Sequence, residues 1–237
     1  MSDDKKWTQI ATGSMSKGAG TTTQVRINQP QLDPQDKKVL CSAMCQCDKA
    51  PNIGKDGQQL KQACVSERMK ALDKLLEHRS PYKQEINYDM TKRPPAPIMD
   101  SAVETKGHSY LPGWIQKYWN SDGTKPPFQA GEGMIRRPDI VIVNDPAKPP
   151  TQDNIKQIVE MKFPPDTATV EQREDYKTIA GSSNKLRILK PSDCDCDAPD
   201  PNPPKIPVET LGWAATIASI LLSIGTRGKG GPTPVMP

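Results

Sequence analysis

The chain has 237 residues, which is room for one domain with extensions or for two small domains. Hydrophobic residues make up only 34% and 25 residues are proline, so we expect a modest core and long irregular segments. The net charge of +4 is smaller than that of strongly basic nucleic-acid binders, so such contact would depend on a local patch. The N-terminal sequence MSDDKKWTQI lacks the apolar run of a signal peptide, which argues against export by the general secretory route.

The N-terminal third divides into a polar arm and a cysteine-containing segment. Residues 1–40, with a Gly/Ser/Thr-rich run at 12–23, are predicted to be a flexible arm. Residues 41–80 hold four of the six cysteines, and apolar side chains recur with a helical period over residues 59–78. Ser80-Pro81 ends this predicted helix, because proline disfavours helical backbone in the residue before it.

The middle of the chain gives weaker signals. Residues 86–88 are predicted to form a short strand, and residues 111–119 a short aromatic helix. Its aromatic side chains, Trp114, Tyr118 and Trp119, can either pack in a core or stack on an unpaired base. His78 and His108 lie in no motif of a histidine-metal nuclease.

The clearest secondary-structure pattern lies between residues 134 and 190. It predicts strands over 139–144, 155–163 and 186–189, with a helix over 170–180 before the last of them. Thr167 or Thr169 can cap this helix, and Gly181 is well suited to end it. After an upstream helix, this order indicates an α/β sheet with a crossover helix.

The C-terminal part, residues 197–237, is predicted to be a Pro-rich linker followed by an apolar segment. The apolar run at 211–224 is shorter than the roughly 20 residues of a membrane span, so no stable span is expected. A packed helix, a docking site for a partner or chaperone, and membrane insertion during delivery all remain open.

The chemistry is concentrated in Asp139 and in the sequence Glu160-Met161-Lys162. Residues two apart on a strand share a face, so Glu160 and Lys162 point the same way, and Asp139 opens the neighbouring strand. Two carboxylates and the Met161 backbone carbonyl suit a hard cation such as Mg²⁺ or Mn²⁺. Lys162 can then position or deprotonate a metal-activated water and neutralise a phosphate.

Four further residues surround this set. Gln172 and Tyr176 share a helix face at i, i+4 spacing, and Gln172 can orient the lysine, the water or a phosphate. Tyr176 is a candidate for substrate binding, or else a packing residue between helix and sheet. Arg136 and Arg137 flank the centre and either grip a phosphate or form surface ion pairs.

The stretches RRPDIVIV, VEMKFPPD and EQREDYKTIAG resemble the PD-(D/E)xK nuclease superfamily, and its VRR-NUC branch most. The resemblance implies a restriction-endonuclease-like α-β-β-β-α-β core over residues 81–196, with irregular N- and C-terminal extensions. It also implies catalytic roles for Asp139, Glu160, Lys162 and Gln172. The family often uses a further glutamate from the first helix. Glu85 and Glu77 are the candidates here, and we favour Glu85.

The stretches CSAMCQCDKAPN, YKQEINYDM and GEGMIRRPD are similar to bacterial toxins delivered by type VI secretion. This resemblance implies an antibacterial DNase that binds DNA, a cognate immunity protein and secretion spike or adaptor proteins. It would be made in the producer's cytoplasm and delivered to that of a target cell. The alternatives are a structure-specific repair nuclease and an inactive nuclease fold that serves as an adaptor.

The cysteines form two clusters, and their state is open. Their spacing is compatible with a structural Zn²⁺, with disulfides formed in an oxidising compartment, or with free thiols. The six residues are Cys41, Cys45, Cys47, Cys64, Cys194 and Cys196.

Overall fold

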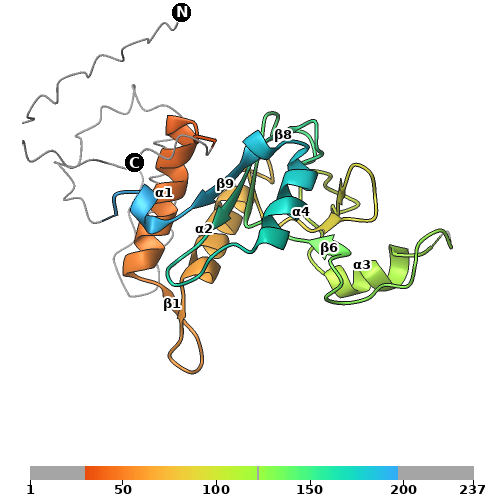
Figure 1. The fold of residues 1–237 in the computed structure, drawn as a ribbon, viewed down its shortest axis with the longest axis horizontal. Helices are drawn as coiled ribbons and strands as arrows, with labels where there is room; N and C mark the ends of the chain where they lie inside the picture. Colours follow the sequence, from red (N-terminus) through yellow and green to blue (C-terminus); the bar gives the residue numbers. More distant parts are fainter. Residues whose placement is uncertain (1–29, 122, 197–237) are drawn as a thin grey trace, which may run out of the picture.

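The protein, analysed as a computed structural model that describes residues 30–121 and 123–196, is built around a four-stranded sheet (Figure 1). Helices α1 (Pro34–Lys49) and α2 (Lys61–Leu75) cover one face, and helix α4 (Val170–Ala180) covers the other. The predicted mixed α/β class is therefore confirmed.

The strand order of the central sheet is β3-β7-β8-β9. Its members are β3 (Tyr82–Gln84), β7 (Ile140–Val143), β8 (Ile155–Met161) and β9 (Leu186–Leu189). The pairs β3–β7 and β7–β8 are antiparallel, whereas β9 runs parallel to β8. A parallel pair needs a crossover, and α4 provides it. The strands and the helix predicted in this region lie where the sequence pattern put them.

The ends of α4 follow from its sequence. The Thr169 hydroxyl accepts from the backbone N–H of Gln172, and the Gln172 side chain accepts in return from the N–H of Thr169. This capping box satisfies two donors that a helix start leaves unpaired. Gly181 ends the helix in the left-handed conformation (φ 73°), which costs glycine no Cβ clash.

The alternating faces of β7 and β8 divide the core into two layers. Ile140, Ile142, Val159 and Met161 face α1 and α2, in a cluster completed by helix residues such as Leu40. On the other face, Val141, Val143, Ile155 and Ile158 pack against Tyr176 and Ile179 of α4. Because both faces are covered, β7 is entirely apolar and β8 is buried at every position except Lys156.

Two predicted boundaries are wrong for local reasons. In place of the strand predicted at 86–88, strand β3 ends at Gln84, where Glu85 adopts a left-handed backbone (φ 48°), and β4 (Tyr88–Asp89) begins only at Tyr88. The helix predicted over 59–78 is α2, which is shorter. It starts after strand β2 (Gln59–Leu60) and ends before Glu77 and His78, both at positive φ.

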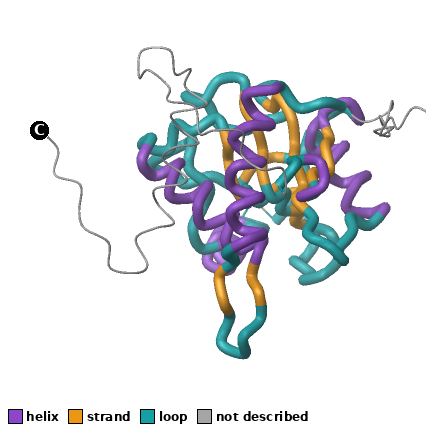
Figure 2. Tube along the Cα trace, turned by 90° about the vertical axis from the view of Figure 1, so that its left-hand side faces the viewer, coloured by secondary structure: helices purple, strands orange, loops and turns teal. Residues whose placement is uncertain are grey.

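A smaller lobe lies beside the sheet, at the right of Figure 1. It consists of the sheet β5-β4-β6, with β5 (Ala96–Pro97) and β6 (Ile135–Arg136), and of helix α3 (Leu111–Tyr118). Trp119 is buried there, and its indole N–H donates to the Pro126 carbonyl at 2.9 Å. Trp119 is thus a packing residue. On the opposite side, β1 (Asn52–Ile53) and β2 form a hairpin that projects from the molecule (Figure 2).

All six cysteines form disulfides, one of the three states that the sequence left open, and this excludes the alternative of a structural Zn²⁺. The bridges are Cys41–Cys194, Cys45–Cys196 and Cys47–Cys64. Zinc is bound by thiolates, and sulfurs bonded to each other cannot supply them. Each bridge has one end in α1, so this helix is fastened both to α2 and to the segment after β9.

The predicted flexible arm, residues 1–40, is wrong over residues 34–40, because α1 begins at Pro34. Asp33 caps this helix by accepting from the Gln35 N–H at 2.9 Å. The rest of the arm up to residue 29, and the linker and apolar segment at 197–237, lie outside the described residues. Within the described residues, no helix is long and apolar enough to cross a membrane.

Candidate active site

The pairing of β7 with β8 brings the two predicted carboxylates together. Ile140 lies opposite Val159, so Asp139, just before β7, reaches the end of β8 where Glu160 lies. The Asp139 carboxylate accepts from the Met161 N–H at 2.8 Å. The Asp139 N–H lies 3.4 Å from Glu160 Oε2. The two acidic side chains thus share one corner of the sheet.

Lys162 joins this corner through an ion pair with Glu160. Its Nζ lies 2.7 Å from Glu160 Oε1, and both side chains are almost fully buried. The strand alternation that predicted a common face for these residues accounts for the contact. A buried charged pair costs desolvation energy, which is a reason to look for a role beyond stability.

The electrostatics of Asp139 indicate a site with excess negative charge. Burial and, next, the charge of Glu160 raise the pKa of Asp139 to about 7, whereas the Met161 N–H and Lys162 act in the opposite direction. The charge of Glu85 adds a smaller upward effect. A divalent cation at this corner would favour both carboxylates in their charged forms.

The Met161 carbonyl, the predicted backbone ligand, has a partner that sequence reasoning missed. Gln62 in the first turn of α2 donates its side-chain N–H to this oxygen at 2.8 Å. A carbonyl oxygen has two lone pairs, so it can accept from Gln62 and still face a cation. No motif marked Gln62, and only its position on the α2 face that also carries Lys70 could have suggested it.

The two acidic candidates for a further ligand lie outside the carboxylate pair. The backbone N–H of Glu85 donates to the Asp139 carbonyl at 2.9 Å. Its carboxylate lies 3.7 Å from Lys70 and 3.9 Å from Arg137. The Glu85 backbone is thus next to Asp139, but its carboxylate is directed to the Lys70 and Arg137 cations. Glu77 follows the end of α2 in a left-handed conformation.

The α4 residues are held by structural contacts. The Gln172 side-chain oxygen is engaged in the capping box of α4. Tyr176 is buried in the core, and its hydroxyl donates to the Arg137 carbonyl at 3.2 Å. The packing alternative therefore describes Tyr176, which also fixes the backbone two residues before Asp139.

The two arginines differ in their surroundings. Arg136 forms ion pairs with Glu171 and Asp175 of α4. Of the two predicted alternatives, a phosphate contact or a surface ion pair, the structure therefore shows the ion pair. The Arg137 side chain is 57% exposed, and among the described residues its guanidinium is paired only with the Glu85 carboxylate, at 3.9 Å. Of the two, Arg137 is the one available to a phosphate.

The donor set fits a hard cation without being a complete cage. In residues 30–121 and 123–196, no three His, Cys, Asp or Glu side chains converge as a metal site. Two carboxylates and one backbone carbonyl do converge at Asp139, Glu160 and Met161. Mg²⁺ is commonly held by one or two carboxylates, with water and substrate phosphate completing its shell.

Comparison with known families identifies the family to which the chain belongs. The sequence profile of the VRR-NUC domain matches residues 66–190, more than half of the chain. The chain therefore belongs to the VRR-NUC domain family, and this membership indicates a nuclease. The matched region contains Asp139, Glu160 and Lys162, whereas all six cysteines lie outside it. No curated protein and no solved structure matches the chain.

Proposed function

We propose that the protein is a metal-dependent DNA endonuclease that hydrolyses phosphodiester bonds at the corner formed by Asp139, Glu160 and Lys162. The observation that carries the proposal is the convergence of the half-buried Asp139 carboxylate, the buried Glu160 carboxylate and the buried Lys162 in the matched domain. The element order α2, β3, β7, β8, α4, β9 also follows the α-β-β-β-α-β order of a PD-(D/E)xK core and supports it.

Each residue has a distinct task in this proposal. Asp139, Glu160 and the Met161 carbonyl would hold Mg²⁺ or Mn²⁺, which lowers the pKa of water and stabilises charge on the phosphate. Glu160 Oε1 accepts from Lys162 and so fixes its ammonium at the end of β8. Lys162 orients the attacking water and neutralises the scissile phosphate. Gln172 and Glu85 are the two further residues that the family resemblance adds to the proposed site.

Metal-dependent cleavage is tested by incubating plasmid DNA with the protein in Mg²⁺, in Mn²⁺ and in EDTA. Asp139→Ala and Glu160→Ala are expected to abolish cleavage, and EDTA to do the same. Glu174→Ala is the matched control, because Glu174 also pairs with a lysine at 2.7 Å but on the exposed face of α4. Cleavage that persists in EDTA or in both site variants would overturn the metal mechanism.

We further propose that the nuclease is an antibacterial toxin, delivered by type VI secretion into the cytoplasm of a target cell and neutralised by a cognate immunity protein. The toxin-like sequence stretches support this role. The three disulfides support passage of the chain through an oxidising compartment, because cytoplasmic thiols usually stay reduced. Oxidation would then follow export from the producer.

Expression in a bacterial host separates the toxin from its alternatives. A toxin should arrest growth unless the immunity protein is co-expressed, and Glu160→Ala should restore growth. A repair nuclease would cleave DNA in vitro without arresting growth. An inactive adaptor would do neither.

A further inference from the structure

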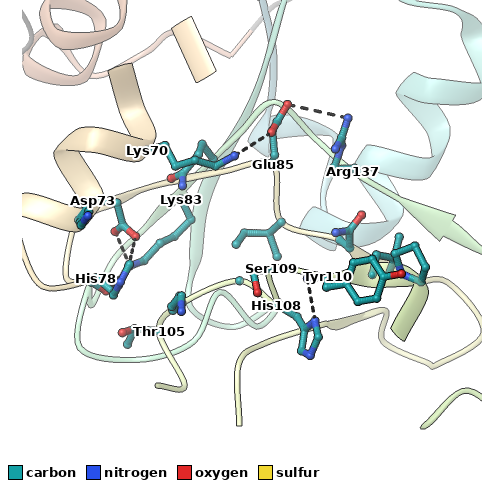
Figure 3. Close-up of a pocket in the computed structure, with 18 residues that line it drawn as sticks. Lys70, Asp73, His78, Lys83, Glu85, Thr105, His108, Ser109, Tyr110 and Arg137 are labelled. Carbon is teal, nitrogen blue, oxygen red and sulfur yellow. Dashed lines mark hydrogen bonds and ion pairs between the residues drawn. The ribbon is translucent and has the colours of Figure 1, made fainter. Parts of the chain in front are cut away.

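A cavity of about 590 Å³ lies next to the catalytic corner, and the proposed chemistry does not use it (Figure 3). Helix α2, the segment after β3 and the loop before α3 form its walls. Two lining residues connect it to the site. Glu85 donates its N–H to the Asp139 carbonyl, and Arg137 precedes Asp139 by two residues. A strand that leaves the corner can therefore enter the cavity directly.

The lining carries an excess of positive charge. Five lysine or arginine side chains face the cavity, against the two carboxylates of Asp73 and Glu85. Asp73 is already paired in the wall, with Lys83 at 3.0 Å and the His78 ring at 2.9 Å. The other four cations are Lys70, Lys74, Lys106 and Arg137.

Glu85 is the one carboxylate left to balance these cations within the lining. In Figure 3 it lies between Lys70 and Arg137, at ion-pair distances of 3.7 and 3.9 Å. Lys106 has a further partner, Asp100, at 3.4 Å. Such loosely held cations around a single carboxylate suit a phosphate, which can displace Glu85 from both neighbours.

The mouth of the cavity also has an aromatic surface. Tyr110 is 64% exposed although it is a large ring, and Leu111 and Pro112 continue the apolar lining beside it. The backbone N–H of Tyr110 donates to His108 Nδ1 at 3.2 Å, so a neutral His108 ring carries its proton on Nε2. An exposed ring next to cations is the arrangement on which unpaired bases stack.

The outer wall is held in place by backbone contacts. Met99 pairs with Gly107 as a β-bridge, and the His108 N–H donates to the Ile98 carbonyl at 3.0 Å. Gly107 approaches Ile86 so closely that a Cβ there would lie 2.8 Å from its Cδ1. The cavity is therefore formed before any ligand arrives, which reduces the ordering cost of binding.

We propose that this cavity binds one unpaired nucleotide of the substrate strand, next to the phosphate that is cleaved. Lys70 and Arg137 contact its phosphate and Tyr110 stacks on its base. The volume is in the range of small-ligand sites, and a paired base must leave the duplex to enter it. The assignment rests on the proposed nuclease function and adds a preference for DNA with unpaired nucleotides.

Binding in EDTA tests the cavity without cleavage. Fluorescence anisotropy is measured with a labelled blunt duplex and with the same duplex carrying a short unpaired thymidine tail. Tyr110→Ala should weaken binding of the tailed duplex about tenfold, the effect of one lost stack, and leave the blunt duplex unchanged. Tyr118→Ala is the matched control, because Tyr118 is also exposed (42%) and outside the cavity.

A second pair of variants tests the charges. Lys70→Ala, which removes one of the two proposed phosphate contacts, should weaken binding of the tailed duplex and reduce the salt dependence of its affinity by about one charge. Lys148→Ala, which removes a lysine from a similar exposed pair with Asp145 (3.2 Å), should change neither. The proposal is overturned if Tyr110→Ala acts like Tyr118→Ala, or if it weakens tailed and blunt duplexes equally.

These outcomes also separate the cavity from the proposed function. Tyr110-dependent binding by a protein that cleaves no DNA with Mg²⁺ or Mn²⁺ would refute the nuclease and leave the cavity assignment standing. Metal-dependent cleavage with no response of binding to Tyr110→Ala would refute the cavity assignment alone.

Discussion

Two regions of the domain, the α1–α2 side of the sheet and the corner formed by Asp139, Glu160 and Lys162, are stabilised in opposite ways. The α1–α2 side combines an apolar core with three disulfides, each with an end in α1. The catalytic corner instead buries charged groups, with Glu160 and Lys162 paired at 2.7 Å and Asp139 beside them. Apolar packing stabilises a fold directly, whereas buried charges at best offset their desolvation.

This difference separates stability from function along the chain. The family profile covers the corner but leaves out α1 and every cysteine. An addition outside the family domain thus supplies covalent reinforcement to a domain whose active corner is destabilising by nature. Active sites commonly trade stability for function in this way.

The largest expected effect concerns the two disulfides that run side by side, Cys41–Cys194 and Cys45–Cys196. Each closes a loop of about 150 residues, since the sequence separations are 153 and 151. With one bridge intact, the other closes an additional ring of only a few residues. Removing one pair should cost about 2–3 kcal/mol, and removing both about 7–8 kcal/mol. The free energies of unfolding follow from equilibrium denaturation of alanine variants.

The third bridge serves as an internal comparison. Cys47–Cys64 spans 17 residues, so its removal should cost about 3 kcal/mol even with the other two intact. If the two parallel bridges contributed additively, each single removal would cost about half of the double removal. That result would contradict the account of α1 as doubly fastened.

The next effect should appear in catalysis and not in metal binding. Lys162→Ala is expected to lower the cleavage rate about a thousandfold, which corresponds to about 4 kcal/mol of barrier. Mn²⁺ affinity, measured by calorimetry, should change little because Lys162 is not a ligand. Lys177→Ala is the control, since Lys177 pairs with Glu174 at the same 2.7 Å but on the surface. Loss of Mn²⁺ binding in Lys162→Ala would show a structural role instead.

The sequence predicts the catalytic corner better than its surroundings, and the reason is periodicity. Strand alternation put Glu160 and Lys162 on one face, and the long apolar strands fixed the register that brings Asp139 to them. The Thr169-x-x-Gln172 spacing is also a capping-box signal, so Gln172 has a structural task beside the catalytic role that the resemblance implies.

The remaining features depend on contacts between distant residues. Six cysteines allow 15 pairings, and only the packing of α1 beside the end of β9 selects the observed ones. The left-handed Glu85 that ends β3 has no Gly or Asn signal in the sequence. The cavity likewise arises where loop residues such as Gly107 pack on Ile86, which no local pattern encodes.

A smaller effect should reveal the cost of the charged corner. The pKa of Asp139 is raised to about 7 from an ordinary value near 4, so the folded protein binds this proton more tightly than the unfolded chain. Stability should therefore fall as pH rises from about 4 to 7. Asp139→Asn removes this cost, and we expect it to stabilise the protein by about 2 kcal/mol at pH 8 in EDTA.

The difference in stability between Asp139→Asn and the wild type should depend on pH and on bound metal. Below about pH 4 the two proteins should unfold at similar temperatures, because Asp139 is protonated in both states of the wild type. With Mg²⁺ at pH 8 the wild type should gain stability that the variant lacks. If Asp139→Asn were less stable than the wild type in EDTA at pH 8, the charge of Asp139 would not be destabilising in the folded protein.

The smallest effect we expect concerns Gln62, the residue through which the cross-linked side reaches the catalytic corner. Gln62 lies two residues before Cys64 and donates to the Met161 carbonyl at 2.8 Å. Groups that orient metal ligands typically change metal affinity tenfold or more when removed. Gln62→Ala should therefore raise the Mg²⁺ concentration for half-maximal cleavage about tenfold. The rate at saturating Mg²⁺ should be preserved, because Asp139, Glu160 and Lys162 remain in place.

Gln58→Ala, in the exposed hairpin, should change neither quantity. If Gln62→Ala lowered the saturated rate instead, Gln62 would act on the reacting groups and the separation between the two regions would not hold.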